Sequence, residues 1–262
     1  MICKICGNKA NPIYKGRILN KYDIQYYYCD NCGFMQTEEP YWLKEAYSEA
    51  ISISDTGVMA RNNGFVETAS ILLSILCERN HKFLDYGGGY GIFTRLMRDK
   101  GFDFYWYDKY ARNLVARGFE GEVDSTIYSA VTSFENFEHF YDPLGDMQTI
   151  SNLTDIVLFS TNLLPNPVPS PSEWWYYCLE HGQHISFFSL KSLEFIAKQC
   201  GYFFISNGAN LHIFSKKKIS KKIFLLTKII RKFGMSRIFY NGSKTFSDMN
   251  DMMHKMSKMD KR

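Results

Sequence analysis

The sequence contains no apolar run that approaches the ~20 residues needed to cross a bilayer. Its first residues also lack the basic and apolar regions of a secretory signal, so we expect a cytoplasmic protein. Proline is scarce, and four of the seven prolines fall within residues 165–171. Cysteines stay reduced in the cytoplasm, which excludes a disulfide framework. The seven cysteines of this chain therefore indicate metal binding or catalysis.

Four of the cysteines form two short pairs, and a glycine follows each pair. The pairs are Cys3-x-x-Cys6-Gly7 and Cys29-x-x-Cys32-Gly33. Four thiolates at this spacing supply the closed tetrahedral ligand set of a structural zinc site. Residues 1–40 are thus predicted to form a zinc ribbon, which zinc binding on the order of 10 kcal/mol can stabilise. Their five Lys/Arg and four Asp/Glu are too balanced for a surface that follows nucleic-acid phosphates.

The net charge of +4 conceals an uneven distribution. Residues 216–262 hold 14 Lys/Arg and 3 Asp/Glu, whereas residues 1–215 hold 17 and 24. Such a basic segment indicates an anionic surface or ligand. Its apolar residues recur at helical spacing: Ile219, Ile223, Leu226, Ile230 and Phe233. The resulting helix either docks on the sheet or on a second subunit, as in a homodimer, or places residues 216–233 on an anionic membrane. We expect the polar residues 241–262 to lack fixed structure.

Three alternating glycines follow a short apolar run that contains Asp85. They are Gly87, Gly89 and Gly91. This pattern predicts a strand that turns sharply into a helix, with a backbone that a ligand can approach closely. A second apolar run ends in Asp108, where a carboxylate can bind both hydroxyls of a ribose. The two features together predict a nucleoside-binding α/β domain.

The glycine spacing distinguishes two kinds of nucleoside site. A dinucleotide fingerprint would require a third glycine where Ile92 stands. Instead, Gly-x-Gly-x-Gly follows Asp85, and this arrangement resembles the first motif of class I methyltransferases. The resemblance implies S-adenosylmethionine as the cofactor in place of NAD. It also implies that Asp85 and the glycines shape the methionine end, while Asp108 holds the ribose.

Apolar runs alternate with helical patterns along the middle of the chain. We expect strands at 83–86, 102–107, 127–134 and 156–160, and helices within 41–80 and at 91–100 and 110–117. This order predicts an α/β fold with a largely parallel sheet and helices on both faces. Residues 190–214 resemble the helix and closing antiparallel strands of the Rossmann-like methyltransferase sheet. The carboxyl ends of the strands would gather Gly87, Asp108 and Glu135 around a ligand.

Residues 133–143 form a second recognisable stretch. It contains Phe134-Glu135, then Glu138-His139, then Asp142-Pro143. The stretch is similar to the segment after the fourth strand in methyltransferases of small molecules and sugars. That similarity implies that Phe134 and Glu135 complete the cofactor pocket. Alternatively, Glu138 and His139 only cap and pack the following helix.

Aromatic residues follow the proline-rich segment 165–171. They are Trp174, Trp175, Tyr176 and Tyr177. The prolines forbid a helix or a central strand and stiffen a surface loop. Aromatic faces with polar edges suit stacking on sugar rings, although a lid packed on the core would give the same pattern.

Two histidines follow the aromatic residues. His181 and His184 lie within five residues of Glu180 and Gln183, which suggests a proton-handling group. Methyl transfer needs little else, because the sulfonium is already activated and positioning supplies much of the rate. Alternatively, one histidine, His181 in particular, only forms hydrogen bonds within the loop.

The same segment resembles sugar C-methyltransferases, which share the four-cysteine module and a Tyr-x-Glu-His-x-Ser-x-Phe-Ser sequence. Their His aligns with His184, their Glu with Gln183 and their Tyr with His181. Without that Glu and Tyr, an enolate intermediate loses support. We therefore favour O-methylation of a sugar hydroxyl, with His184 as the base and His181 supporting it. C-methylation of a nucleotide sugar is the alternative.

The sequence thus predicts three parts: a zinc ribbon (1–40), a methyltransferase domain (41–215) and a basic helical tail (216–262). The acceptor would be a nucleotide- or lipid-linked sugar of a bacterial surface polysaccharide precursor, in the cytoplasm or at the inner membrane. A hypothesis of another class is a non-catalytic zinc module that recruits nucleic acid through its basic tail. Intact Asp85, Asp108 and glycines argue against that hypothesis.

Overall fold

The computed structural model describes residues 1–48, 51, 54–78 and 81–259. The strands are β1 (Asn11–Ile18), β2 (Tyr22–Tyr28), β3 (Met35–Thr37), β4 (Lys82–Tyr86), β5 (Asp103–Tyr107), β6 (Ala130–Ser133), β7 (Ile156–Ser160), β8 (Ser186–Phe187), β9 (Phe203–Ser206) and β10 (Leu211–Ser215). The α-helices are α1 (Leu43–Ala46), α2 (Val58–Leu76), α3 (Ile92–Asp99), α4 (Pro143–Ser151), α5 (Leu190–Gln199), α6 (Lys222–Lys232) and α7 (Thr245–Met259). The 3-10 helices are η1 (Phe137–His139), η2 (Trp175–Tyr177) and η3 (Met235–Phe239). Within the described residues, every helix falls short of the length and apolarity that crossing a membrane requires.

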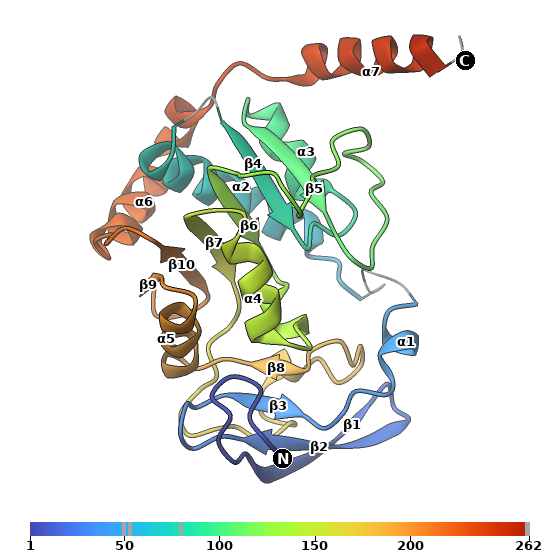
Figure 1. Cartoon of the computed structure of the whole chain (residues 1–262), viewed down its shortest axis with the longest axis vertical. Helices are drawn as coiled ribbons and strands as arrows, with labels where there is room; N and C mark the ends of the chain where they lie inside the picture. Colours follow the sequence, from blue (N-terminus) through green and yellow to red (C-terminus); the bar gives the residue numbers. More distant parts are fainter. Residues whose placement is uncertain (49–50, 52–53, 79–80, 260–262) are drawn as a thin grey trace. The chain divides into compact units, whose positions relative to one another are not determined.

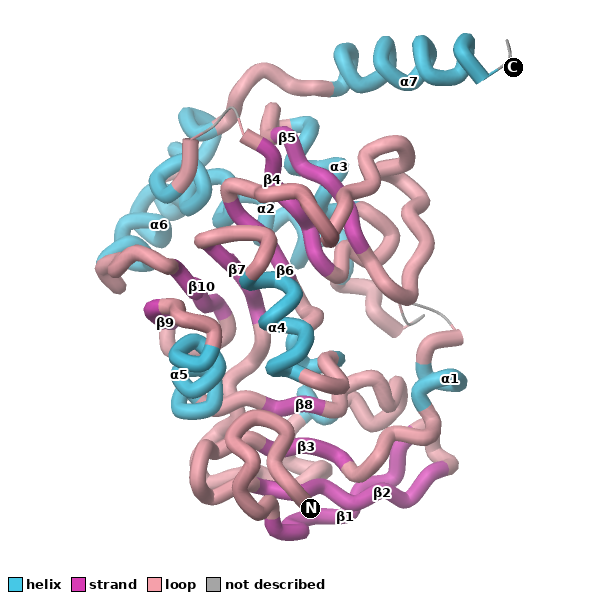
Figure 2. The backbone as a smooth tube through the Cα atoms, viewed as in Figure 1, coloured by secondary structure: helices cyan, strands magenta, loops and turns pink. Residues whose placement is uncertain are grey.

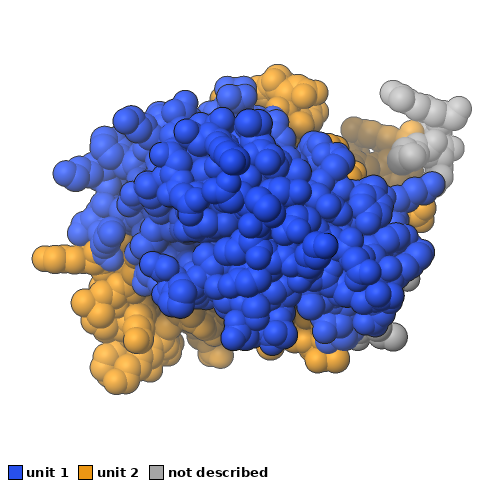
Figure 3. Space-filling view, turned by 90° about the horizontal axis from the view of Figure 1, so that it is seen from below, with its two compact units in different colours: residues 1–54, 133–221 blue, residues 55–132, 222–262 orange. Residues whose placement is uncertain are grey.

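The chain folds as two compact units, each assembled from two stretches of sequence. Unit 1 comprises residues 1–54 and 133–221, and unit 2 comprises residues 55–132 and 222–262 (Figure 3). Figure 1 labels the helices and strands of both units. The predicted division at residues 40 and 215 follows the order of the sequence, whereas the compact units interleave along it. Each unit is therefore described by itself.

The larger sheet has the strand order β5-β4-β6-β7-β10-β9 (Figure 2). Strand β4 runs parallel to β5 and β6, whereas β10 runs antiparallel to β7 and β9. The alternation of these strands with helices confirms the α/β class. The closing antiparallel pair also lies where the sequence predicted it, at β9 and β10.

Strand β4 lies inside the larger sheet and β5 at its edge, and both bury apolar side chains. Phe83 and Phe104 are fully buried, and their rings stack with centroids 5.2 Å apart. The parallel register pairs Tyr86 with Tyr107, so the two strands end together. This shared end places the turn that follows Tyr86 beside Asp108, the residue after β5.

A second, smaller sheet in unit 1 has the order β1-β2-β3-β8. Strands β1 to β3 come from the predicted ribbon, and β8 comes from residues 186–187. Met35 of β3 pairs with Phe187 of β8, and Gln36 pairs with Ser186. The sheet that begins in the N-terminal 40 residues is therefore completed by a strand from the segment that contains His184.

Apolar side chains from the same two stretches share one core. Tyr26, Trp42, Tyr177 and Phe187 are all buried in it. The rings of Tyr26 and Tyr177 meet edge to face, with centroids 5.0 Å apart. The indole Nε1 of Trp42 donates a hydrogen bond of 2.7 Å to the carbonyl of Gly182. Residues near the N-terminus thus fix the position of the loop that carries the histidines.

Residues 110–117 form turns, so the predicted helix there is wrong. Asp108 Oδ1 accepts hydrogen bonds from the backbone N–H of Tyr110 at 2.8 Å and of Ala111 at 2.7 Å. Asn113 Oδ1 accepts one from the N–H of Ala116 at 2.9 Å. Short polar side chains that bind nearby backbone groups favour turns over helices. The apolar spacing alone did not reveal this competition.

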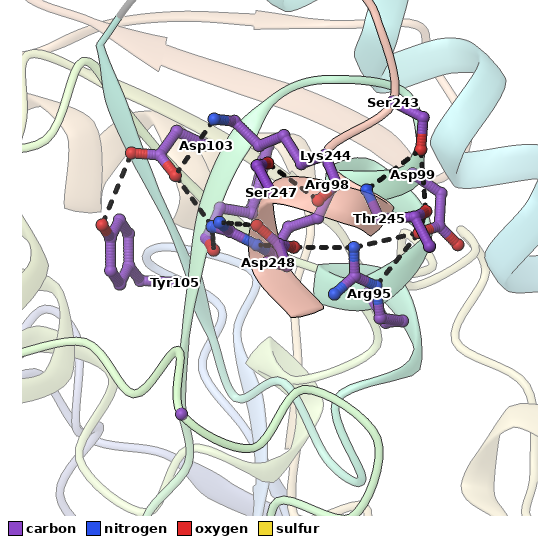
Figure 4. A network of polar contacts seen from close by, with 12 residues as sticks. Arg95, Arg98, Asp99, Asp103, Tyr105, Ser243, Lys244, Thr245, Ser247 and Asp248 are labelled. Atoms are coloured by element: carbon purple, nitrogen blue, oxygen red, sulfur yellow. Dashed lines mark hydrogen bonds and ion pairs between the residues drawn. The ribbon is translucent and has the colours of Figure 1, made fainter. Parts of the chain in front are cut away.

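The expectation that residues 241–262 lack fixed structure is wrong for Thr245–Met259, which form α7, and residues 260–262 lie outside the described part of the chain. The helix is anchored by the buried carboxylate of Asp248 (Figure 4). Arg98 of α3 donates two hydrogen bonds to that carboxylate, at 2.7 and 2.8 Å, and Arg95 forms an ion pair at 2.8 Å. Arg98 also donates to Asp103 at 2.8 Å. A composition argument could not find this anchor, since one aspartate supplies it.

Candidate functional site

The predicted glycine turn joins β4 to α3 in unit 2. Gly87, Gly89 and Gly91 have positive φ values of 78°, 52° and 87°, a region that side chains disfavour. The N–H of Gly87 donates a hydrogen bond of 2.8 Å to the carbonyl of Tyr107. The turn is therefore tied to the end of β5, and α3 starts directly after Gly91.

Neighbouring protein atoms leave no room for a side chain at two glycines of the turn, whereas a third glycine faces open space. A Cβ on Gly91 would lie 2.8 Å from Asn113 Oδ1, and a Cβ on Gly88 would lie 2.6 Å from Trp106. In contrast, a Cβ on Gly89 would have no heavy atom within 4 Å. Gly88 was not among the predicted residues, because its constraint comes from Trp106 on the neighbouring strand. The open side of the turn lies at Gly89.

Asp108 is bonded to this turn. Its Oδ2 accepts a hydrogen bond of 2.8 Å from the N–H of Gly89, while Oδ1 accepts from the N–H groups of Tyr110 and Ala111. A carboxylate offers about four acceptor positions. The backbone uses three of them, which fixes the orientation of the carboxylate and leaves acceptor capacity on Oδ2. The proposed contact with a ribose stays a prediction.

Asp85 is a buried brace within unit 2. Its Oδ2 accepts a hydrogen bond of 2.9 Å from Thr94 of α3, and its Oδ1 lies 3.3 Å from the hydroxyl of Thr132 in β6. The pKa of Asp85 is raised to about 7, mainly by burial and to a smaller extent by the charge of Asp108, while the hydrogen bonds from Thr94 and Thr132 oppose the rise. The side chain thus holds the turn and two neighbouring elements together from the inside.

In unit 1, Phe134 and Glu135 follow β6 directly. Glu135 has a φ of 50°, which is uncommon for a residue with a side chain and indicates local strain. The hydroxyl of Ser160, at the end of β7, accepts from the N–H of Glu135 at 2.8 Å and donates to its carboxylate at 2.6 Å. These bonds hold the strained residue at the carboxyl end of the strand.

Glu138, His139 and His184 form a cluster in unit 1, with one polar atom of each within 4.8 Å of the others. The two imidazole rings meet edge to face, with centroids 4.9 Å apart. His184 Nδ1 lies 2.7 Å from the carbonyl of Tyr176, which can only accept. Nδ1 therefore carries the hydrogen, and the lone pair is on Nε2. His139 Nδ1 lies 2.9 Å from the hydroxyl of Tyr47.

The alternative was that Glu138 and His139 only cap and pack the next helix, and its capping part is wrong. Asp142 caps α4 instead, because its side chain accepts a hydrogen bond from the N–H of Gly145. Glu138 is fully buried in η1, and its carbonyl accepts from the N–H of Ile185 at 2.9 Å. The motif thus faces the histidine segment.

Burial keeps the three side chains of the cluster uncharged near neutral pH. It raises the pKa of Glu138 to about 8, with a further contribution from the charge of Glu135. It lowers the pKa of His139 to about 4 and that of His184 well below its usual range. A carboxyl and two imidazoles are donors that suit a divalent ion. However, the carbonyls of Gln183 and Glu135 next to His139 favour a ring N–H there, which argues against His139 as a metal ligand.

The other predicted catalytic residue, His181, lies outside this cluster. It is half-buried, and its Nε2 lies 3.2 Å from the hydroxyl of Ser54. Its N–H donates to the carbonyl of Cys178, which closes the turn before His184. The structure therefore places both histidines in one loop of unit 1, with separate hydrogen-bond partners.

Among the four clustered aromatic residues after the prolines, Trp175 is the exposed one. It has 72% of its surface accessible, whereas Tyr176 and Tyr177 are buried and Trp174 is partly buried against the core. Tyr176 also binds the backbone, since its hydroxyl accepts from the N–H of Asn162 at 3.1 Å. Three of the four aromatic side chains therefore pack against the core, and only Trp175 offers an exposed ring on which a ligand could stack.

The four paired cysteines converge in unit 1. Their sulfur atoms lie within 4.8 Å of one another, with Cys3 and Cys32 at 3.5 Å and Cys6 and Cys29 at 3.4 Å. The two loops have matching geometry: Gly7 donates to the carbonyl of Cys3, and Gly33 to that of Cys29. Both glycines have φ values near 70°. Sulfur atoms bound to one zinc ion at ~2.3 Å are about 3.8 Å apart, so the donor set fits zinc.

A family model of a methyltransferase domain matches residues 61–206, more than half of the chain. The chain belongs to this methyltransferase family. The matched range contains the glycine turn, Asp108, Glu135 and the cluster around His184, and it excludes the four paired cysteines and α6. No curated protein sequence matches the chain significantly.

Several solved methyltransferase structures are similar to this chain. Magnesium protoporphyrin IX methyltransferase from Synechocystis PCC 6803, with bound SAM, is 11% identical and has a TM-score of 0.44. That match covers 67% of this chain and 89% of the other. An O-methyltransferase family 2 protein from Planctomyces limnophilus is 14% identical with a TM-score of 0.42, and the match covers 66% of this chain and 65% of the other.

Proposed function

We propose that this methyltransferase uses S-adenosylmethionine to O-methylate a sugar hydroxyl, in a precursor of a bacterial surface polysaccharide. The hydrogen bond between the N–H of Gly89 and Asp108 Oδ2 carries the proposal. It orients a carboxylate beside a turn whose backbone is open at Gly89, the arrangement that a ribose and its attached sulfonium require. Gly87 and Gly91 maintain the turn, and Asp85 supports it from within.

The four cysteines would hold one structural zinc ion. The donor set is closed, because Cys3, Cys6, Cys29 and Cys32 fill all four tetrahedral positions. When bound, the ion would cross-link the two glycine-containing loops of the N-terminal module. It would therefore support the fold and take no part in methyl transfer.

The acceptor side would use the loop that contains His184. Nε2 of His184 has a lone pair, because Nδ1 is committed to the carbonyl of Tyr176. The ring is neutral near pH 7, so Nε2 can accept the hydroxyl proton as the oxygen attacks the methyl group. His181 would support this loop, Phe134 and Glu135 would border the cofactor, and Trp175 would stack on the sugar.

The cofactor assignment is tested by calorimetry of S-adenosylmethionine and of its demethylated product. We expect saturable binding to the wild type and at least a tenfold weaker affinity for Asp108→Ala, since the carboxylate acceptor is removed. Asp108→Asn, which keeps the size of the side chain, should also weaken binding. Asp124→Ala changes an exposed carboxylate in the same unit and should have no effect. An affinity for Asp108→Ala equal to that of the wild type refutes the ribose assignment.

The acceptor assignment is tested with His184→Ala. We expect turnover to fall at least a hundredfold through loss of the base, with the affinity for S-adenosylmethionine retained. Methyl transfer to a panel of sugar acceptors supplies the rate, and NMR of the product locates the methyl group. Wild-type turnover by the variant removes His184 as the base. A methyl group on carbon instead supports the C-methyltransferase alternative.

A further inference from the structure

Helix α6 of unit 2 has one face packed against protein. Ile223, Thr227 and Ile230 are buried on this face. Arg231 donates hydrogen bonds to Glu67 and Thr68 of α2, at 3.2 and 3.0 Å. The buried face of α6 therefore docks on α2 within unit 2.

A second apolar row of α6 points to solvent. Leu225, Ile229 and Phe233 follow each other at four-residue steps, with 60%, 42% and 68% of their surfaces exposed. Leu226 lies next to this row and is 46% exposed. The row is continued in sequence by exposed Ile238 of η3. A contiguous group of large exposed apolar side chains marks an interaction surface.

The charges in the segment that carries this row all have one sign. Residues 216–247 contain ten Lys/Arg and no Asp/Glu. In unit 2, exposed Lys228 and Lys232 lie on the helix that carries the row, and exposed Arg237 follows in η3. An apolar row bordered by cations is complementary to a surface with anionic headgroups above hydrocarbon.

We propose that the outward face of α6 and η3, defined by Leu225, Leu226, Ile229, Phe233 and Ile238 with Lys228, Lys232 and Arg237, binds the surface of an anionic lipid bilayer. The apolar row would enter the boundary between headgroups and acyl chains, and the cations would lie at the lipid phosphates. The buried face of α6 stays on α2, so binding needs no rearrangement of the helix. This location goes beyond methyl transfer and does not depend on it.

The charges favour a bilayer over the other occupants. A second copy of the chain that paired α6 with α6 would bring Lys228 and Lys232 close to their own copies, which is repulsive. A nucleic acid would use the cations, but it would leave Leu225, Ile229 and Phe233 exposed. A bilayer uses both kinds of side chain.

The test is flotation of the full chain with phosphatidylcholine vesicles that contain or lack phosphatidylglycerol. We expect binding that requires phosphatidylglycerol and weakens with salt. The triple variant Leu225→Gln, Ile229→Gln, Phe233→Gln should bind at least tenfold more weakly. The double variant Lys228→Gln, Lys232→Gln should lose about fivefold in affinity for each cation removed. Ile127→Gln changes an isolated exposed side chain of the same unit and should bind as the wild type does.

Three results would overturn the proposal. The first is a wild type that does not bind phosphatidylglycerol vesicles at low salt. The second is a triple variant, folded by circular dichroism, that binds them as the wild type does. The third is a wild-type dimer in light scattering that the triple variant dissociates, because the face would then join two copies. Failure to bind S-adenosylmethionine would refute the proposed function and leave these measurements unaffected.

Discussion

Individual residues in the turn after β4 have different tasks. Gly89 faces open space, whereas Gly88 and Gly91 are glycines because Trp106 and Asn113 occupy the space of a side chain. We therefore expect alanine at Gly88 or Gly91 to disturb packing inside unit 2. Alanine at Gly89 adds strain through its positive φ and places a methyl group on the open side.

Asp85 gives the free energy of unfolding a characteristic pH dependence. Its pKa of about 7 in the folded chain lies above the unfolded value of ~3.9. Between these two pH values the folded state binds more protons than the unfolded state. The contribution of Asp85 to the free energy of unfolding is therefore complete below about pH 4 and is lost as the pH rises to about 7. The slope from this one group is about 1.4 kcal/mol per pH unit. Asp85→Asn should remove it, as measured by urea unfolding from pH 4.5 to 7.5.

The matched control for this experiment is Asp124→Asn, which changes an exposed carboxyl group of the same unit. It should leave the slope of the wild type in place. An Asp85→Asn profile parallel to the wild-type profile would show that Asp85 does not titrate in this range.

The sequence was sufficient to predict the roles of residues that depend on nearby positions in the chain. It was not sufficient for residues whose contacts lie far away in the sequence. The spacing of Cys3 and Cys6, repeated once, was enough to place four sulfur atoms together. The task of Asp85 depends on Thr132, which lies 47 residues away, and a pattern within one strand contains no information about it. For the same reason, the meeting of Glu138 with His184 was not predicted.

Among the elements, α7 depends on one buried ion-pair network (Figure 4). Burial disfavours the charge of Asp248, but the guanidinium groups of Arg98 and Arg95 outweigh burial and lower its pKa. Most other side chains along α7 are exposed, including Phe246 and Met253. Little apolar burial therefore competes with this anchor.

Asp248→Ala should release α7 and destabilise unit 2. Removing one partner leaves Arg98 buried without its main counter-charge, a change that costs about 3–5 kcal/mol. We expect lower stability in urea and faster hydrogen exchange across residues 245–259. Asp251→Ala, on the exposed side of the same helix, should change neither quantity measurably. Unchanged exchange in Asp248→Ala would mean that other contacts hold the helix.

Two elements show why local patterns were insufficient at this scale. The segment 110–117 has helical spacing, but Asp108 accepts from the backbone N–H of Tyr110 near its start and Asn113 accepts from that of Ala116 near its end. Strand β8 is only two residues long and forms because β3 offers it a partner. Both outcomes depend on neighbours that periodicity does not describe, whereas the longer strands β4, β5 and β7 were predicted from their own apolar runs.

At the scale of the whole molecule, the N-terminal module and the histidine loop are one structure. Pairing of β3 with β8, the bond from Trp42 to Gly182 and a bond of 2.7 Å from Gln183 to the carbonyl of Ala46 connect them within unit 1. We therefore expect the four paired cysteines of this module to influence the position of His184 through the shared sheet.

Loss of the proposed zinc site should loosen the histidine loop. In Cys29→Ser we expect at most trace zinc, faster hydrogen exchange across residues 176–188 and reduced turnover. Cys200→Ser changes a cysteine of the same unit outside the cluster and should retain about one zinc ion per chain. Wild-type exchange in the zinc-free variant would contradict the coupling of the module to the loop.

The late arrival of β8 has a consequence for biosynthesis. A ribosome that adds roughly 5–20 residues per second needs on the order of ten seconds to proceed from Thr37 to Ser186. During that interval β3 has no partner on its outer side, and an unpaired strand edge invites association with other chains. Nascent molecules should therefore be most prone to aggregate before residue 187 emerges.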